Sequence, residues 1–335
     1  MSSGGSARAV VAALGANVAI AVSKLVAFAF SGSSSMLAEG IHSLADSGNQ
    51  VLLLIGGRKS QREASDEHPF GYGRERYVFG FLVAVVLFSL GGLFAIYEGY
   101  EKIKSPHPLD NVAWPLGVLA FALVAESFSF RTAITEARAV RGRESWVGFI
   151  RHAKAPELPV VLLEDFGALI GLVLALFGVV LTAVTHDGVW DGVGTLAFGV
   201  LLTGAALVLG GETKSLLLGE GANSAQVSRI RAALVDGEVV TSVIHMRTMH
   251  LGPDELLVAA KIGVEHDDTA AQVARAIDAA EARVRAAVPI ATVIYLEPDI
   301  RRPAAAVDAQ NVDAQNTAEK AEPTGSGSRA DAPSQ

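Results

Sequence analysis

A histidine and an aspartate, His42 and Asp46, stand four residues apart in an apolar run that ends near Gly57. On a helix this spacing places both side chains on one face, one turn apart. A neutral imidazole and a carboxylate together suit Zn²⁺ or a neighbouring divalent ion. The alternative role is a buried hydrogen bond that joins two helices. Because an ionisable side chain within a membrane span costs at least about 2.5 kcal/mol, the pair is a candidate functional site.

Two more carboxylates, Glu164 and Asp165, lie in a second apolar run, LPVVLLEDFGALIG, which contains no basic residue. Carboxylates surrounded by hydrocarbon need a cation or protons. A divalent ion held between the two runs satisfies all of these groups, whereas Lys24 is the main alternative cation at that depth. Glu164 and Asp165 are adjacent and point about 100° apart on a helix. One is therefore a ligand candidate, and the other a candidate for supporting the ligands or carrying protons.

Two other polar residues in apolar runs have open roles. Asn49 lies near the same helix face as Asp46, where it either donates a hydrogen bond to a ligand or packs between helices. Glu126 belongs either to a proton path or near the cytoplasmic membrane surface, with its carboxylate reaching for water. We favour the second role for Glu126.

Composition places these residues in a multi-pass membrane protein. Half of the 335 residues are hydrophobic and the mean hydropathy is +0.38, which is too apolar for an ordinary soluble enzyme. A net charge of −8 gives no indication of nucleic-acid binding. The absence of cysteine excludes disulfides and thiolate ligands, which leaves His, Asp and Glu for metal binding.

Six apolar runs reach the roughly 20 residues that a helix needs to cross a bilayer. Basic residues concentrate between the second and third runs and between the fourth and fifth, so these loops and both termini are expected in the cytoplasm. No cleavable signal or targeting presequence is evident, and we expect a cell (inner) membrane of bacterial type. The six runs are about Arg8–Phe30, Ser35–Gly57, Tyr77–Glu101, Val112–Ala133, Leu158–Val184 and Gly192–Gly211.

The sequence predicts three parts: a six-helix transmembrane domain at residues 1–214, a cytoplasmic domain at 215–302 and a disordered tail at 303–335. In the second part, helical spacing and strand-like alternation follow one another in the order α-β-β-α-β. The fold class is therefore an α-helical membrane protein with a small C-terminal α+β domain, which we expect to be ferredoxin-like. The tail repeats VDAQN in tandem and then loses its apolar periodicity.

The loop after the second run, DEHPFGYGRERY, contains Asp66 and His68 as candidate ligands of a second metal ion. The favoured alternative is a turn built by Pro69 and two glycines, with the neighbouring arginines facing lipid headgroups. The cytoplasmic part contains His245, and Glu297 follows in its last strand.

Six spans, the AEGIHSLADSGNQ stretch, the HPFGYGR loop, acidic residues in the fifth span and an α-β-β-α-β tail together resemble the cation diffusion facilitators. The resemblance covers about Ala7 to Asp299. The stretch VLLEDFGALIG is most similar to the subgroup that includes the mitochondrial zinc exporter. Members are homodimers that export Zn²⁺, and sometimes Mn²⁺, Co²⁺, Fe²⁺ or Cd²⁺, in exchange for protons.

The resemblance implies a transport site with two ligands from the second span and two from the fifth. His42 and Asp46 match the first pair and Asp165 matches one ligand of the second. The other matching position is Val161, which does not bind metal, so the fourth ligand is water or Glu164.

The resemblance also implies sites outside the bilayer. Asp66 and His68 match a loop where some members bind an additional ion. His245 matches a metal position in the cytoplasmic domain, where Glu297 would complete a weakened site because Tyr295 replaces a usual ligand.

These expectations describe a divalent metal efflux transporter. The favoured form is a Zn²⁺/H⁺ antiporter that works by alternating access. The metal and the proton are substrates, no cofactor or enzymatic reaction is expected, and the partners are the bilayer and a second copy of the chain. The alternatives are export of Mn²⁺, Fe²⁺ or Co²⁺ by the same mechanism, or a membrane metal sensor that transports nothing.

Overall fold

The computed structural model describes the backbone of residues 3–31, 34–106 and 113–300, and the side chains of residues 7–26, 29, 43–44, 46–106 and 116–300. The chain divides into two compact units. The first comprises Met1–Ala222 and Thr248–Leu257, and the second comprises Asn223–Arg247 and Val258–Gln335. The predicted tail, residues 303–335, lies outside the described residues.

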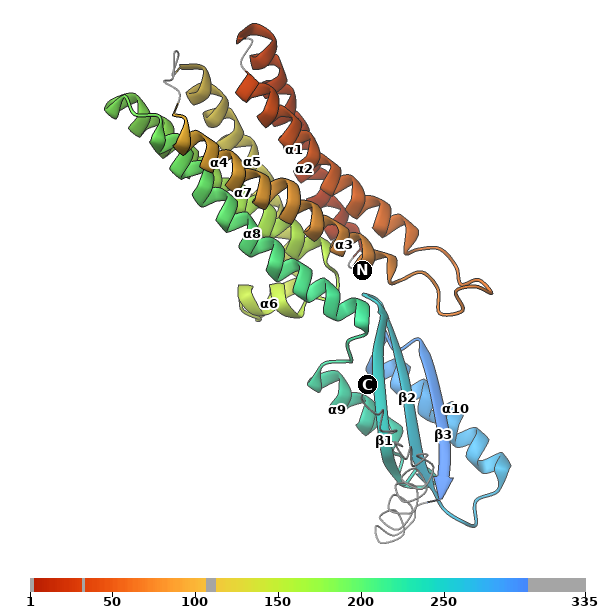
Figure 1. Cartoon of the computed structure of the whole chain (residues 1–335). Coiled ribbons are helices and arrows are strands. Elements are labelled where there is room, and N and C mark those ends of the chain that lie inside the picture. The colour runs from red at the N-terminus through yellow and green to blue at the C-terminus, as the bar shows by residue number, and fades with distance from the viewer. Residues whose placement is uncertain (1–2, 32–33, 107–112, 301–335) are drawn as a thin grey trace, which may run out of the picture. The chain divides into compact units, whose positions relative to one another are not determined.

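The first unit is a bundle of long helices that run side by side (Figure 1). Apolar residues fill most positions of these helices, and a short helix, α6, which the apolar runs did not predict, connects α5 to α7. The elements are α1 (Ser3–Ser31), α2 (Ser34–Lys59), α3 (Glu75–Val86), the π-helix η1 (Leu87–Leu93), α4 (Phe94–Lys104), α5 (Ala113–Arg141), α6 (Trp146–His152), α7 (Glu157–Thr185) and α8 (Val189–Leu218).

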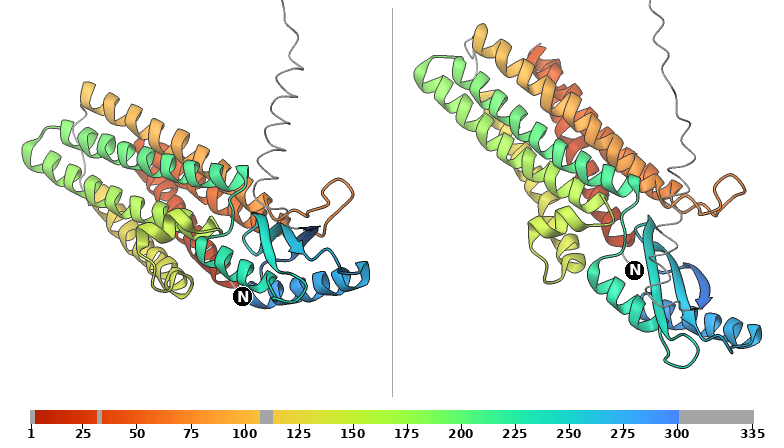
Figure 2. Two further views of the ribbon diagram at one scale, coloured as in Figure 1. Left: turned by 90° about the horizontal axis from the view of Figure 1, so that it is seen from below. Right: turned by 60° about the horizontal axis from the view of Figure 1, so that its bottom comes forward.

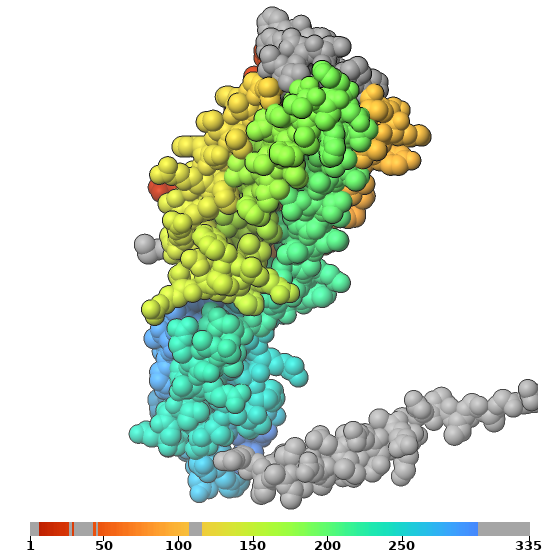
Figure 3. Space-filling view, turned by 90° about the vertical axis from the view of Figure 1, so that its left-hand side faces the viewer, coloured from red at the N-terminus to blue at the C-terminus, as the bar shows by residue number. Residues whose placement is uncertain are grey.

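Five segments of the described residues are long and apolar enough to cross a membrane, which confirms five of the six predicted spans. α2 is 26 residues long, but the side chains of its first part lie outside the described residues, and its span remains a prediction. Large apolar side chains are exposed on the outside of the bundle, as lipid contact requires. Figure 3 shows a face of the molecule formed largely by α5, α7 and α8. The exposed apolar residues of these three helices include Phe128, Phe177 and Leu207. The chain is a multi-pass membrane protein.

α3, η1 and α4 form one continuous helical rod beside α8 (Figure 2). Glycines let the two backbones approach closely. A Cβ atom at Gly99 would lie 2.5 Å from the backbone nitrogen of Leu196, and one at Gly199 would lie 2.6 Å from that of Ile96. Membrane helices pack by such contacts because lipid gives no hydrophobic drive for their association.

A buried ion pair joins α3 to the start of α7. The guanidinium of Arg76 donates to the carboxylate of Glu157, and each residue is less than one-tenth exposed. The expectation that arginines of this loop face lipid headgroups is therefore wrong for Arg76, because a buried carboxylate on another helix neutralises it.

The second unit contains α9 (Ser224–Leu234), most of β1 (Ser242–Gly252) and β2 (Glu255–Val264), α10 (Ala270–Ala287) and β3 (Val293–Ile300). The strands form one sheet in the order β1-β2-β3. Asn223 and Thr269 begin the two helices with capping boxes. The element order α-β-β-α-β is as predicted, and the ferredoxin-like arrangement remains a prediction.

A buried histidine, His250, lies in the β1 segment that belongs to the first unit. Its backbone N–H donates to the carbonyl oxygen of Glu220 at 2.8 Å, and its side chain is almost completely buried. Burial, followed by the positive charge of Lys154, lowers the pKa of His250. The fold therefore favours the neutral ring.

We expect Gly99→Val to destabilise the bundle by about 1–3 kcal/mol, because the new side chain collides with the α8 backbone. Thermal unfolding of the full chain in detergent measures the change. Gly204→Val on α8 is the matched control, since its Cβ would meet nothing within 4 Å. Equal losses in the two variants would contradict close packing of α4 and α8.

We expect the unfolding free energy to fall as the pH falls below about 6.5, the pKa of histidine in an unfolded chain. With a lowered pKa in the fold, His250 binds a proton more readily when unfolded, so its contribution is complete at neutral pH and is lost in acid. In denaturation curves at several pH values, His250→Leu should flatten this dependence. His245→Leu, at an exposed histidine of the same strand, should leave it unchanged.

Candidate metal centre

The predicted ligands come from α2 and α7, which belong to the same helical bundle. His42 is within α2, but its side chain lies outside the described residues. Asp46, one turn further along α2, is half-buried. Asp165 on α7 is only 2% exposed. The structure thus places two of the predicted carboxylates inside the bundle, on different helices.

Asp165 is held by α5. The hydroxyl of Ser129 donates a hydrogen bond of 2.6 Å to its Oδ2, and Ser129 is completely buried. This bond leaves the second oxygen of the carboxylate with its lone pairs available for a cation. Sequence reasoning missed Ser129, because a single serine in an apolar helix does not identify its partner.

Glu164 points toward α2 and is held by two amides. Its Oε1 accepts a hydrogen bond from Asn49 Nδ2 at 3.2 Å, and its Oε2 accepts one from Gln50 Nε2 at 2.7 Å. All three residues are buried. Both carboxylate oxygens therefore accept hydrogen bonds that join α2 to α7, and the side-chain amide of Asn49 donates to Glu164. This geometry favours a helix-linking role for Glu164, while its role as fourth ligand remains a prediction.

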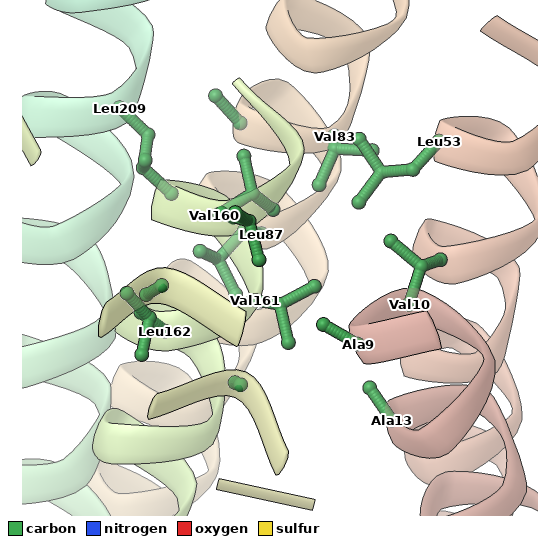
Figure 4. Packing of buried hydrophobic residues seen from close by; sticks show 14 of the residues in the cluster. Ala9, Val10, Ala13, Leu53, Val83, Leu87, Val160, Val161, Leu162 and Leu209 are labelled. Atoms are coloured by element: carbon green, nitrogen blue, oxygen red, sulfur yellow. The ribbon is translucent and has the colours of Figure 1, made fainter. Parts of the chain in front are cut away.

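Val161, at the position where the resemblance implies a ligand, belongs to an apolar cluster. It is fully buried, and Figure 4 shows it among apolar side chains that include Leu87, Ala9 and Val10. The stretch of α7 from Leu158 to Leu163 is thus apolar, between the buried Glu157 at the first position of the helix and Glu164.

A cavity of about 200 Å³ reaches into the bundle beside Asp46. Its wall near Asp46 also carries Glu126 of α5 and Lys24 and Asn17 of α1. Lys24 Nζ donates a hydrogen bond of 3.0 Å to Ser43 on α2. Glu126 is only 5% exposed, so it does not reach for water at the membrane surface as we expected.

The same cavity extends to a charged group that joins α4 to α8. The ammonium of Lys102 lies 3.3 Å from Glu98 and 3.1 Å from Asp191, and it donates to the hydroxyl of Thr195 at 3.4 Å. These residues are near the last turn of α4 and the first turns of α8. The cavity therefore connects the middle of the bundle with the end where α4 stops and α8 begins.

The structure does not bring the remaining candidate ligands together. The ring of His68 contacts that of Tyr72, with centroids 4.6 Å apart, and Asp66 is exposed. His245 is on β1 and Glu297 on β3, with β2 between them, a separation of about 10 Å at the usual strand spacing. Glu297 instead pairs with Lys261 at 3.2 Å. Among described side chains, no three His, Asp or Glu residues gather as a metal would require.

Residues 10–218 match the family defined by the cation efflux transmembrane domain. The chain belongs to the cation efflux family. The match begins in α1 and ends at the last residue of α8, so it covers the helices that carry Asp46, Glu126 and Asp165. It confirms the resemblance to cation diffusion facilitators.

Three relatives illustrate the range of this cation efflux family. The chain is 30% identical over 241 residues to the proton-coupled zinc antiporter SLC30A9, mitochondrial, of Xenopus laevis, an alignment that covers 71% of this chain and 43% of the relative. It is 29% identical over 259 residues to metal tolerance protein C4 of Arabidopsis thaliana, covering 77% and 57%. It is 25% identical over 266 residues to the cation-efflux pump FieF of Salmonella arizonae, covering 78% and 81%. The chain thus spans less than half the length of the Xenopus antiporter.

We expect Glu164→Gln to cost stability more than metal affinity. The glutamine amide would place one N–H group against a donor, which leaves a buried hydrogen bond unmade at a cost of about 1–3 kcal/mol. Chemical unfolding and Zn²⁺ calorimetry on the full chain measure the two effects. Asp165→Asn is the comparison, since it should lower metal affinity. A Glu164→Gln protein that is stable but loses Zn²⁺ as Asp165→Asn does would identify Glu164 as a ligand.

Proposed function

We propose that this protein exports a divalent metal cation from the cytoplasm in exchange for protons, with Zn²⁺ as its first substrate. The observation that carries the proposal is the presence of Asp46 and Asp165 inside the bundle of a cation efflux protein. Ionised carboxylates at such depth are costly unless a cation or protons balance their charge. The name of the Xenopus relative, a proton-coupled zinc antiporter, agrees with this choice of substrates.

The proposed ligands are His42, Asp46 and Asp165, with water or Glu164 in the fourth position. One imidazole with two or three oxygens favours Zn²⁺ over Mn²⁺, which prefers an all-oxygen set. The asymmetry at Val161 leaves fewer protein ligands on α7 than on α2. The fourth position is therefore where we expect the choice among Zn²⁺, Co²⁺, Fe²⁺ and Mn²⁺ to be made.

Proton coupling follows from the chemistry of these ligands. A metal binds the neutral imidazole and the ionised carboxylates, so binding releases any protons that they hold. When the site faces the other side of the membrane, protons replace the metal and reduce the buried negative charge of the empty site. An inward proton gradient would then drive metal export by alternating access to a site near the bilayer midplane.

The proposed orientation places the loops after α2 and after α5 in the cytoplasm, because basic residues concentrate there. Both termini lie on the same side in this arrangement, and the cell membrane is the proposed location. The cavity end near Lys102 then faces outward. We also propose a homodimer, as the family resemblance implies.

Reconstituted vesicles test this function. With an imposed pH gradient, we expect Zn²⁺ to elicit proton flux through the wild-type protein, and His42→Ala/Asp46→Ala to abolish it because two ligands are lost. A panel of Zn²⁺, Mn²⁺, Co²⁺, Fe²⁺ and Cd²⁺ ranks the substrates.

The matched control is Glu144→Ala/His152→Ala, which removes an exposed carboxylate–histidine pair, 2.9 Å apart, outside the cavity. It should transport as the wild type does. Wild-type flux in the His42/Asp46 variant would exclude the proposed site, and metal binding without flux in the wild type would indicate a sensor.

A further inference from the structure

Glu126 is a buried carboxylate for which the proposed ligand set has no use. It lies near the middle of α5, about 20 Å along the helix from its first residue, Ala113. Glu126 is only 5% exposed, and it lines the same cavity as Asp46. A burial of this extent in a membrane bundle requires compensation for the charge.

The described residues offer Glu126 little compensation. No hydrogen bond or ion pair to its carboxylate is present among them. The charged groups that act on it through space are two carboxylates, Asp165 and Asp46, and one ammonium, Lys24. Lys24 also serves Ser43 with a hydrogen bond. The balance of charge around this part of the cavity is therefore negative, which attracts a cation.

The position of Glu126 on α5 links the two sides of the candidate site. Ser129, three residues later and thus on nearly the same helix face, holds Asp165. Glu126 faces the cavity that Asp46 shares. From there the cavity leads to Glu98 and Asp191 at the end of the bundle, where Lys102 joins them. Glu126 thus stands between the proposed ligands and the cavity's far end.

We propose that Glu126 binds the transported divalent cation, together with Asp46, at a second position in the cavity. There the ion would have oxygen ligands from Glu126 and Asp46, with Asn17 within the same wall and water completing its shell. A divalent ion entering from the Asp165 side would pass this position before it reaches Lys102. The proposal rests on the proposed function, because Asp46 is shared with the transport site.

Carboxylate and amide oxygens define the class of ligand. They are hard donors, which suit Mn²⁺, Co²⁺ or hydrated Zn²⁺, and they give no preference to an organic cation. The cavity volume of about 200 Å³ holds a metal ion with several waters. The second position should therefore bind its ion more weakly than a site that includes an imidazole. Weak binding suits a position that the ion must leave again during transport.

Calorimetric titration of the full-length protein in detergent with ZnCl₂ and MnCl₂ tests the proposal. Glu126→Gln keeps the size of the side chain and removes its charge, and we expect it to weaken metal binding by about tenfold or more. Glu126→Asp keeps the carboxylate and should recover most of the affinity. The control is Glu136→Gln, a half-buried glutamate on the same helix outside the cavity, which should bind as the wild type does.

A second measurement needs no variant. A hydrophobic carbodiimide modifies carboxyl groups within membranes, and peptide mass analysis locates the products. We expect saturating Zn²⁺ to protect Glu126 together with Asp46, and to leave exposed Glu63 equally modified. If Glu126→Gln fails to fold, this labelling still decides the question.

Unchanged affinity in Glu126→Gln, or labelling of Glu126 that Zn²⁺ does not reduce, would overturn the proposal. Its failure differs from failure of the proposed function. Wild-type vesicles that move no metal refute antiport, while the titration and the labelling still report on Glu126. Vesicles that transport normally with Glu126→Gln, together with unchanged binding, refute only the second position.

Discussion

The cost of charge in a hydrocarbon environment governs the arrangement of this bundle. The three buried carboxylates of α7 each have a partner: Glu157 has Arg76, Glu164 has two amides, and Asp165 has a serine hydroxyl. The partners differ in strength. A guanidinium neutralises a carboxylate, an amide pair only solvates it, and one hydroxyl does less than either. For these three residues the compensation therefore weakens from the first residue of α7 toward its interior.

This gradient separates structural carboxylates from those available to a substrate. Adjacent residues on α7, Glu164 and Asp165, point to different helices because successive helical positions differ by about 100°. One thereby fixes α2 against α7, while the other is held by α5 with an oxygen left for a cation. An ion bound by Asp46 and Asp165 would join the same helices that Glu164 already joins. Metal binding would then adjust the packing of α2 against α7, which Glu164 already holds together.

The sequence could predict the apolar helices, the element order of the second unit and the candidate ligands on α2 and α7, since these depend on local periodicity and spacing. It could not predict which buried groups meet. Ser129 and Gln50 look like ordinary polar residues until the fold places them against carboxylates. From the sequence Arg76 is an ordinary loop arginine, because its partner Glu157 is distant in the chain. Glu126 reads as a residue at the membrane surface because sequence gives depth along a helix, while burial depends on which face the neighbours cover.

Close packing also limits how such a bundle can move. The α4–α8 contact is made by backbone against backbone at glycines, and the Lys102 group fastens the same two helices with Glu98 and Asp191. Helices packed this tightly move as one body, because separating them would open voids in a close-packed interface. The contacts between α2 and α7 are different in kind, since amide–carboxylate hydrogen bonds can exchange partners at little change in packing. The proposed alternation of access to the cavity would therefore be easier between α2 and α7 than between α4 and α8, and α2 and α7 carry the proposed ligands.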